Sequence, residues 1–251
     1  MMILSIAYRE FRSLFLSPLA WSILATLQFI LGYLFLTQVE TFTALKDQLE
    51  GIDNAPGLTT IIVTPLYGNA AIILMLVTPL LTMRLICEER RNKTLPLLLA
   101  APISTRDIII GKFLGVWGLQ LTITGLITLM PLSLLAGGTL DYGQFFANIL
   151  ALILLLAAFT ATGLYMSCKA GHPTVAAMCT FGLLLLLWIL DWSAGLKDQE
   201  SPLLAYLSLL KHFQNMQSGL IATADLSYFV LFTAAFILLS IRNLDNDRLQ
   251  R

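Results

Sequence analysis

Six long apolar segments constrain this chain more than any other feature of its sequence. Most of them are close to the roughly 20 residues that an α-helix needs to cross the hydrocarbon core of a bilayer. They cover about residues 19–39, 66–83, 108–136, 145–167, 174–190 and 226–241. Charged residues make up 12% of the chain, about half the share that is typical of soluble domains. We therefore predict an all-α integral membrane protein, with six transmembrane helices in a single domain over residues 1–251.

The loop between the second and third segments determines the predicted orientation. It carries six basic residues, which are Arg84, Arg90, Arg91, Lys93, Arg106 and Lys112. Near the predicted span ends, twelve Lys and Arg residues fall on the side of this loop and three on the other side. Because loops rich in Lys and Arg stay in the cytoplasm, both chain ends are predicted to be cytoplasmic. The acidic residues Glu40 and Asp47 are assigned to the first outer loop.

An amphipathic helix is predicted before the first span, over residues 3–16 of an interface segment 1–17. Its apolar positions recur at helical spacing, and they are Ile3, Leu4, Ala7, Phe11, Leu14 and Phe15. Arg9, Glu10 and Arg12 fall on the other side, and a helix of this kind lies in the plane of the membrane surface. Ser17 and Pro18 then form the N-cap and first position of span one. The sequence leaves open whether this helix is only an anchor or also contacts a partner.

Residues 193–225 are predicted to form a re-entrant or interfacial segment on the outer side. This stretch is too apolar for a solvated loop, yet Lys211, His212 and Gly219 interrupt it. Backbone at membrane depth is tolerated only where it is buried in protein, so we expect this segment to pack against the spans.

Ionisable residues are absent from the central parts of the predicted spans. Such groups inside a membrane are usually functional, so their absence argues against an enzyme or a proton-coupled carrier. The larger polar residues in or near the spans are Gln28, Asn69, Gln120 and Asn148. They either form hydrogen bonds between helices or line a substrate path. The histidines and three cysteines have no metal-ligand spacing, and a net charge of zero gives no indication of nucleic-acid binding.

Glycines at the start of the third span predict close helix packing. Gly111 and Gly115 form a GxxxG pattern, and Gly118 follows on the same segment. Small residues let two helices approach closely, so these glycines predict a contact within the subunit or with a second copy, or part of a substrate path. Pro79 and Pro131 fall inside the second and third spans and are predicted to kink them, as fixed bends or as hinges.

A short apolar helix is predicted inside the basic loop, over residues 94–101. Its residues are the cap Thr94, the apolar run Leu95, Leu97, Leu98 and Leu99, and the stop Pro102. An apolar helix of this kind is unfavourable in water, so it lies on the membrane or inserts into a groove of another protein. Ser104 is predicted to cap the helix of span three, with Asp107 three residues later.

Residues along most of the chain carry a family resemblance. In the basic loop they are Pro79 to Arg84, Glu88, Glu89, Thr94, Leu95, Leu97, Leu98, Leu99, Pro102, Ile103, Ser104 and Gly111 to Phe113. In this order they resemble the second span and coupling helix of type-2 ABC exporter permeases, in the gliding-motility-type branch. The residues from Ser17 to Trp21 and from His212 to Phe229 resemble the start of that branch's span one and the approach to its span six.

The resemblance implies a non-catalytic membrane subunit of an ATP-driven exporter in a bacterial inner membrane. Two permease copies or paralogues would pair with two cytoplasmic ABC ATPases, which hold the ATP and Mg²⁺, while the permease binds no cofactor. The coupling loop over residues 84–107 would seat in a cleft of the ATPase, and spans two and five would shift at the dimer interface. The amphipathic helix would lie against the ATPase through Arg9, Phe11, Arg12 and Phe15. Membrane lipid is a further implied partner, and the branch allows an auxiliary envelope subunit.

Two positions depart from the resemblance, and two other functions stay open. Family members often have Gly where Lys93 stands and an acidic residue where Pro96 stands, so the start of the coupling helix differs. A matched change in the partner ATPase is our hypothesis for this difference. The alternative functions are a secondary carrier and a non-transport scaffold of a motility or envelope machine. The substrate cannot be read from the sequence.

Overall fold

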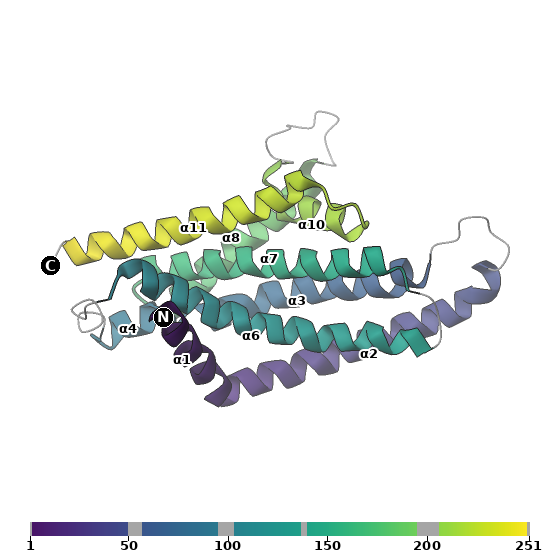
Figure 1. Cartoon of the computed structure of the whole chain (residues 1–251), viewed down its shortest axis with the longest axis horizontal. Helices are drawn as coiled ribbons and strands as arrows, with labels where there is room; N and C mark the ends of the chain where they lie inside the picture. The colour runs from purple at the N-terminus through teal and green to yellow at the C-terminus, as the bar shows by residue number, and fades with distance from the viewer. Residues whose placement is uncertain (1, 50–56, 95–102, 137–139, 195–205, 250–251) are drawn as a thin grey trace.

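The computed structural model describes residues 2–49, 57–94, 103–136, 140–194 and 206–249. Across these residues the secondary structure is helical, and six helices are long and apolar enough to cross a membrane. They are α2 (Pro18–Leu49), α3 (Thr64–Thr82), α6 (Thr105–Ser133), α7 (Tyr142–Lys169), α8 (Pro173–Ala194) and α11 (Thr223–Leu249). These helices run roughly side by side as a bundle (Figure 1). The predicted all-helical fold with six spans is therefore confirmed.

Helix α7 lies at the centre of the bundle and is buried along most of its length. It packs against α3, α6, α8 and α11, and its middle is rich in alanine, threonine and glycine. Small residues allow this close packing. At Gly163 of α7, a Cβ atom would lie only 2.1 Å from Thr82 Oγ1 of α3, so only glycine fits there.

Two helices continue beyond the predicted spans. Helix α2 continues to Leu49 and α11 continues to Leu249, whereas the apolar segments end near residues 39 and 241. Glu40 and Asp47 therefore lie in a helix and not in a loop. A helix satisfies its own backbone hydrogen bonds, and no Gly or Pro interrupts either extension, so it need not end where its side chains become polar.

Shorter helices complete the described fold. Helix α1 (Met2–Leu16) packs along the start of α6, and α4 (Cys87–Arg91) lies near the same end of the bundle as the C-terminal end of α11 (Figure 1). The π-helical turn η1 (Thr59–Val63) precedes α3, and the 3₁₀ turn η2 (Leu134–Ala136) follows α6. Ser17 caps α2 as predicted, because its Oγ accepts a hydrogen bond from the Leu19 amide at 3.3 Å. Helix α10 (Leu209–Gln217) packs against α7, α8 and α11.

The segment around α10 is held by a buried histidine. His212 Nδ1 lies 2.5 Å from Asp225 Oδ1 of α11, and its Nε2 lies 2.9 Å from the Tyr206 carbonyl. Its ring stacks on Tyr228 with centroids 4.1 Å apart. Within the predicted segment 193–225, residues 195–205 lie outside the described residues.

Candidate functional site

The basic loop leaves the bundle after α3 and returns to it at α6. We call its described parts, residues 83–94 and 103–112, the loop base. Residues 95–102 lie between these parts and outside the described residues. The predicted short helix, with Leu95, Leu97, Leu98, Leu99 and Pro102, therefore falls on undescribed chain. The structure instead describes how the two stems of the loop are held.

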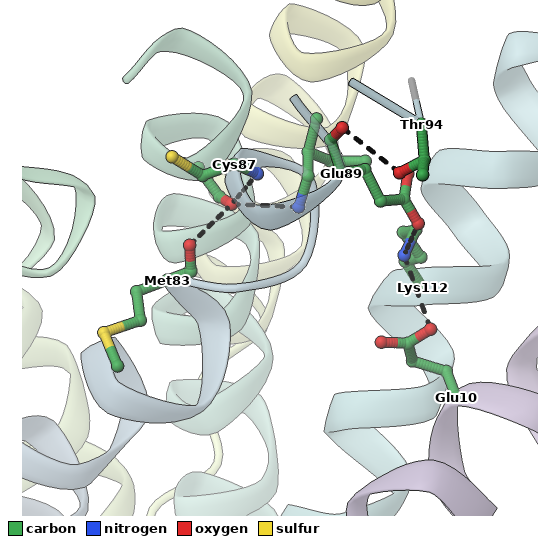
Figure 2. Close-up of polar contacts among 8 residues, drawn as sticks. Glu10, Met83, Cys87, Glu89, Thr94 and Lys112 are labelled. Carbon is green, nitrogen blue, oxygen red and sulfur yellow. Dashed lines mark hydrogen bonds and ion pairs between the residues drawn. The ribbon is translucent and has the colours of Figure 1, made fainter. Parts of the chain in front are cut away.

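Ser167 of α7 supports the stem that leads out of α3. Helix α3 ends at Thr82, and α4 begins at Cys87, so the intervening turn interrupts the helical hydrogen bonds. The buried Ser167 hydroxyl accepts hydrogen bonds from the amides of Ile86 at 3.1 Å and Cys87 at 3.2 Å. It also donates to the Met83 carbonyl at 3.2 Å (Figure 2). One hydroxyl has one donor and two acceptor sites, so all of its bonding capacity is used at this turn.

Lys112 of α6 holds the same stem from the other side. Its Nζ lies 2.8 Å from Glu89 Oε1 in α4 and 3.4 Å from Glu10 Oε2 in α1 (Figure 2). The lysine side chain is only 3% exposed, against 23% for Glu89 and 18% for Glu10. A buried ammonium group is costly unless it is paired and hydrogen-bonded, and here both partners are carboxylates. Three separate helices therefore meet at one cation.

The C-terminal end of α11 contacts both stems of the loop. Asp247 forms an ion pair with Arg90 of α4, and Asp245 accepts a hydrogen bond from the Thr105 hydroxyl at the start of α6. These two aspartates lie beyond residue 241, in the extension of α11 that the sequence did not predict. The extension thus bridges the point where the loop leaves the bundle and the point where it returns.

Helix α1 lies directly on the glycines at the start of α6. A Cβ atom on Gly111 would lie 2.7 Å from Ile6 Cγ2, and one on Gly115 would lie 2.7 Å from Glu10 Cβ. At Gly118 the nearest atom, a ring carbon of Phe11, would be 3.2 Å away. Real Cβ contacts are not this short at the first two positions, so glycine is what permits the close approach. The sequence left the partner of these glycines open, and it is α1 of the same subunit.

Comparison with known proteins identifies the family of the chain. A model of the family described as ABC-2 family transporter protein matches residues 4–243. The chain belongs to the ABC-2 transporter family. No curated protein matches the sequence. The chain is thus the permease of an ABC transporter, and its family implies a partner ATPase.

Family membership also confirms the non-catalytic role that was expected of the chain. ABC-2 permeases are membrane subunits without catalytic activity and without an expected cofactor. Among the described residues, no group of three His, Cys, Asp or Glu side chains is arranged to hold a metal ion.

Several predicted site residues of this ABC-2 permease belong to the loop base. Glu89 is engaged with Lys112, whereas Glu88 is exposed. Thr94 closes α4, because its hydroxyl donates to the Glu89 carbonyl at 3.2 Å. Ser104 caps α6 as predicted, and its Oγ accepts from the Arg106 amide at 3.3 Å.

Lys93 adopts the left-handed conformation, with φ of 58°. Its amide donates to the Arg90 carbonyl at 3.2 Å, and the next amide, of Thr94, donates to the Glu89 carbonyl at 3.0 Å. These two hydrogen bonds form a Schellman motif at the end of α4, a position that favours glycine. A glycine at position 93 would adopt this conformation without strain.

The predicted face of α1 divides into two sets. Phe11 and Phe15 turn toward the bundle, with ring centroids 4.7 Å apart, and Phe15 packs against Trp21 of α2. Arg9 and Arg12 are exposed and line a shallow groove. Of these four residues the two arginines are the exposed ones, and Tyr8 and Ser13 line the same groove.

The larger polar residues of the spans differ in their contacts, and Gln120 is the one that joins three helices. Gln120 of α6 donates to Thr78 of α3 at 2.8 Å and accepts from Thr160 of α7 at 2.5 Å. Asn148 donates to the Gln144 carbonyl within α7 at 2.8 Å. Asn69 lies in the wall of an open cavity between α3, α8 and α10.

The roles of Lys112 and Ser167 were not predicted from the sequence. A lysine in a basic loop resembles an orientation signal, and a serine in a span resembles ordinary packing.

Proposed function

We propose that this permease couples ATP hydrolysis by cytoplasmic ABC ATPase subunits to export of a substrate, or to mechanical work, across a bacterial inner membrane. In this proposal it belongs to the gliding-motility-type branch and works as a homodimer or with a paralogous permease. The basic loop is the part that the ATPase engages, and both termini are cytoplasmic. The exposed Arg9 and Arg12 of α1 lie close enough to the loop base to contact the same partner.

The observation that carries the proposal is the attachment of both loop stems to the bundle. The outgoing stem is bonded to α7 through Ser167 and to α6 through Lys112. The returning stem is bonded to α11 through Thr105. A force applied to the loop is therefore transmitted to several spans at once, which is what a coupling element requires. A loop that served only to connect two spans would have no need of buried polar attachments, since these are costly to form.

The first experiment tests the assignment of the loop. The permease, carrying an affinity tag, is co-expressed with the ABC ATPase encoded beside it, and the complex is purified from membranes. Replacing Leu97, Leu98 and Leu99 by Ala should abolish retention of the ATPase and its stimulation by the permease. Arg242→Ala, an exposed change in α11 outside the loop, should leave both intact. Unchanged retention in the triple variant would exclude the loop as the ATPase contact.

The second experiment tests the orientation. Single cysteines at Ser104 and Gln214, in a chain whose native cysteines are replaced, are labelled with a membrane-impermeant maleimide. The proposal requires labelling of residue 104 only in inverted vesicles and of residue 214 in intact cells. The reverse pattern would contradict the assigned orientation.

A further inference from the structure

We propose that Lys112 is a positioning residue that fastens α1 to α4, so that both helices respond together when the ATPase acts on the basic loop. This inference rests on the proposed function and names the residue through which α1 takes part in it. In the sequence, Lys112 only counted as one of the basic residues that set the orientation.

The burial of Lys112 separates it from the other basic residues of the loop base. Its side chain is 3% exposed, whereas Arg84, Arg91 and Lys93 are exposed. Orientation by positive charge requires no particular contact, so an orienting lysine has no reason to be buried. A lysine that is removed from water and bonded to two carboxylates has instead a defined place in the structure.

The two partners of Lys112 belong to elements that are far apart in the chain. Glu10 lies in α1, and Glu89 lies in α4, directly before the undescribed part of the loop. An ammonium group offers three donors, and two of these suffice to reach both carboxylates, at 3.4 Å and 2.8 Å. The distance between α1 and α4 is thus set by one side chain of α6 (Figure 2).

The positions of Glu10 and Glu89 depend on the positive charge of Lys112. The cluster combines two carboxylates with one ammonium group, so it is stable only while the cation lies between them. Without Lys112, Glu10 and Glu89 would repel each other across a partly buried space, where screening by solvent is weak. Loss of the cation therefore does more than remove two attractions, because it drives α1 and α4 apart.

The neighbouring glycines explain why α1 is within reach of the lysine. Gly111 and Gly115 lie on either side of Lys112 in sequence, and both have α1 atoms where a Cβ would be. Helix α6 thus supplies a surface for close packing and the cation that ties this surface to α4. The close packing at the glycines and the ion pairs of Lys112 together hold α1 next to α4 at the loop base.

The test uses the complex of permease and ATPase in lipid nanodiscs. Spin labels at Arg9→Cys in α1 and Arg91→Cys in α4, with the native cysteines replaced, report the distance between the two helices. The rate of ATP hydrolysis and the amount of retained ATPase are measured on the same variants without labels. Lys112→Met should broaden the distance distribution and lower the stimulated hydrolysis several-fold, with the ATPase retained. Lys112→Arg should preserve both, and Arg242→Met, an exposed control in α11 outside the loop, should change neither.

An unchanged distance distribution and unchanged stimulation in Lys112→Met would overturn the inference. Should that variant fail to purify as a folded protein, Glu89→Ala removes only the α4 partner and leaves the pair with Glu10 in place. It should also broaden the distribution, and an unchanged distribution would again overturn the inference. Failure of the native chain to retain or stimulate the ATPase would instead contradict the proposed function, while the distance measurement would still decide the role of Lys112.

Discussion

Asp247 near the end of α11 pairs with Arg90 of α4, although 157 residues separate them in the chain. The two side chains are 30% and 29% exposed. Exposed ion pairs contribute little to stability because solvent screens them. The value of this pair therefore lies in where it holds α4, rather than in how much it stabilises the fold.

Replacing Asp247 and Asp225 by Ala, one at a time, should show whether burial determines how much each pair stabilises the fold. Asp247→Ala should lower the free energy of unfolding by at most about 1 kcal/mol. Asp225→Ala should cost more, about 1–3 kcal/mol, because it leaves Nδ1 of the buried His212 without its hydrogen-bond partner. Thermal unfolding of both variants in one detergent provides the comparison. Equal losses would show that burial does not distinguish the two pairs.

Gly115→Ala should weaken the packing of α1 on α6. The added methyl group would meet Glu10 Cβ at 2.7 Å, and overpacking of this kind costs about 1–3 kcal/mol. Gly125→Ala in the same helix is the matched control, since a Cβ there has no neighbour within 4 Å. The control should be neutral or slightly stabilising, because alanine favours a helix. Limited proteolysis near α1 should detect release of the helix in the first variant alone.

Lys93→Gly should stabilise the end of α4. A non-glycine residue in the left-handed conformation costs about 1 kcal/mol, which glycine avoids. Asn92→Gly is the control, because Asn92 has a φ of −80° and gains nothing from the change. Slower hydrogen exchange of the Thr94 amide is expected in Lys93→Gly and not in Asn92→Gly. Equal or faster exchange in Lys93→Gly would mean that the Lys93 side chain stabilises the turn in another way.

Ser167→Ala should destabilise the turn between α3 and α4. The change leaves two amides and one carbonyl without their common partner, and each unsatisfied buried group costs about 1–3 kcal/mol. Ser133→Ala is the control, because the Ser133 hydroxyl donates only to the Met130 carbonyl of its own helix and is exposed. The two variants should differ clearly in melting temperature. Similar melting temperatures would indicate that the turn has other support.

The sequence predicted the spans well because hydropathy is a property of local composition. The start of α2 at Pro18 and the cap of α6 at Ser104 were also predicted correctly, since capping depends on residues within one turn. The placement of Glu40 and Asp47 in a loop was wrong, because polar residues mark where a helix can leave the bilayer and not where it ends. No local signal shows that Asp245 and Asp247 meet the loop base.

The residues of the loop base could be predicted only in part. Glu89 and the glycines were identified from their place in a family pattern and in a GxxxG pattern. Their actual partners, Lys112 and α1, come from the tertiary arrangement of the helices, and α1 lies about 100 residues before the glycines in the chain. Ser167 carries no sequence signal at all, because its role exists only where α7 passes the end of α3.

The attachment of both stems divides the basic loop into two parts. The stems are bonded to the membrane domain, and residues 95–102 connect them. The described contacts that hold the stems to α1, α6, α7 and α11 come from residues outside the stretch 95–102. Replacing the sequence of residues 95–102 would leave the residues that form these contacts unchanged. Under the proposed function, a change of ATPase partner would require substitutions in this short stretch.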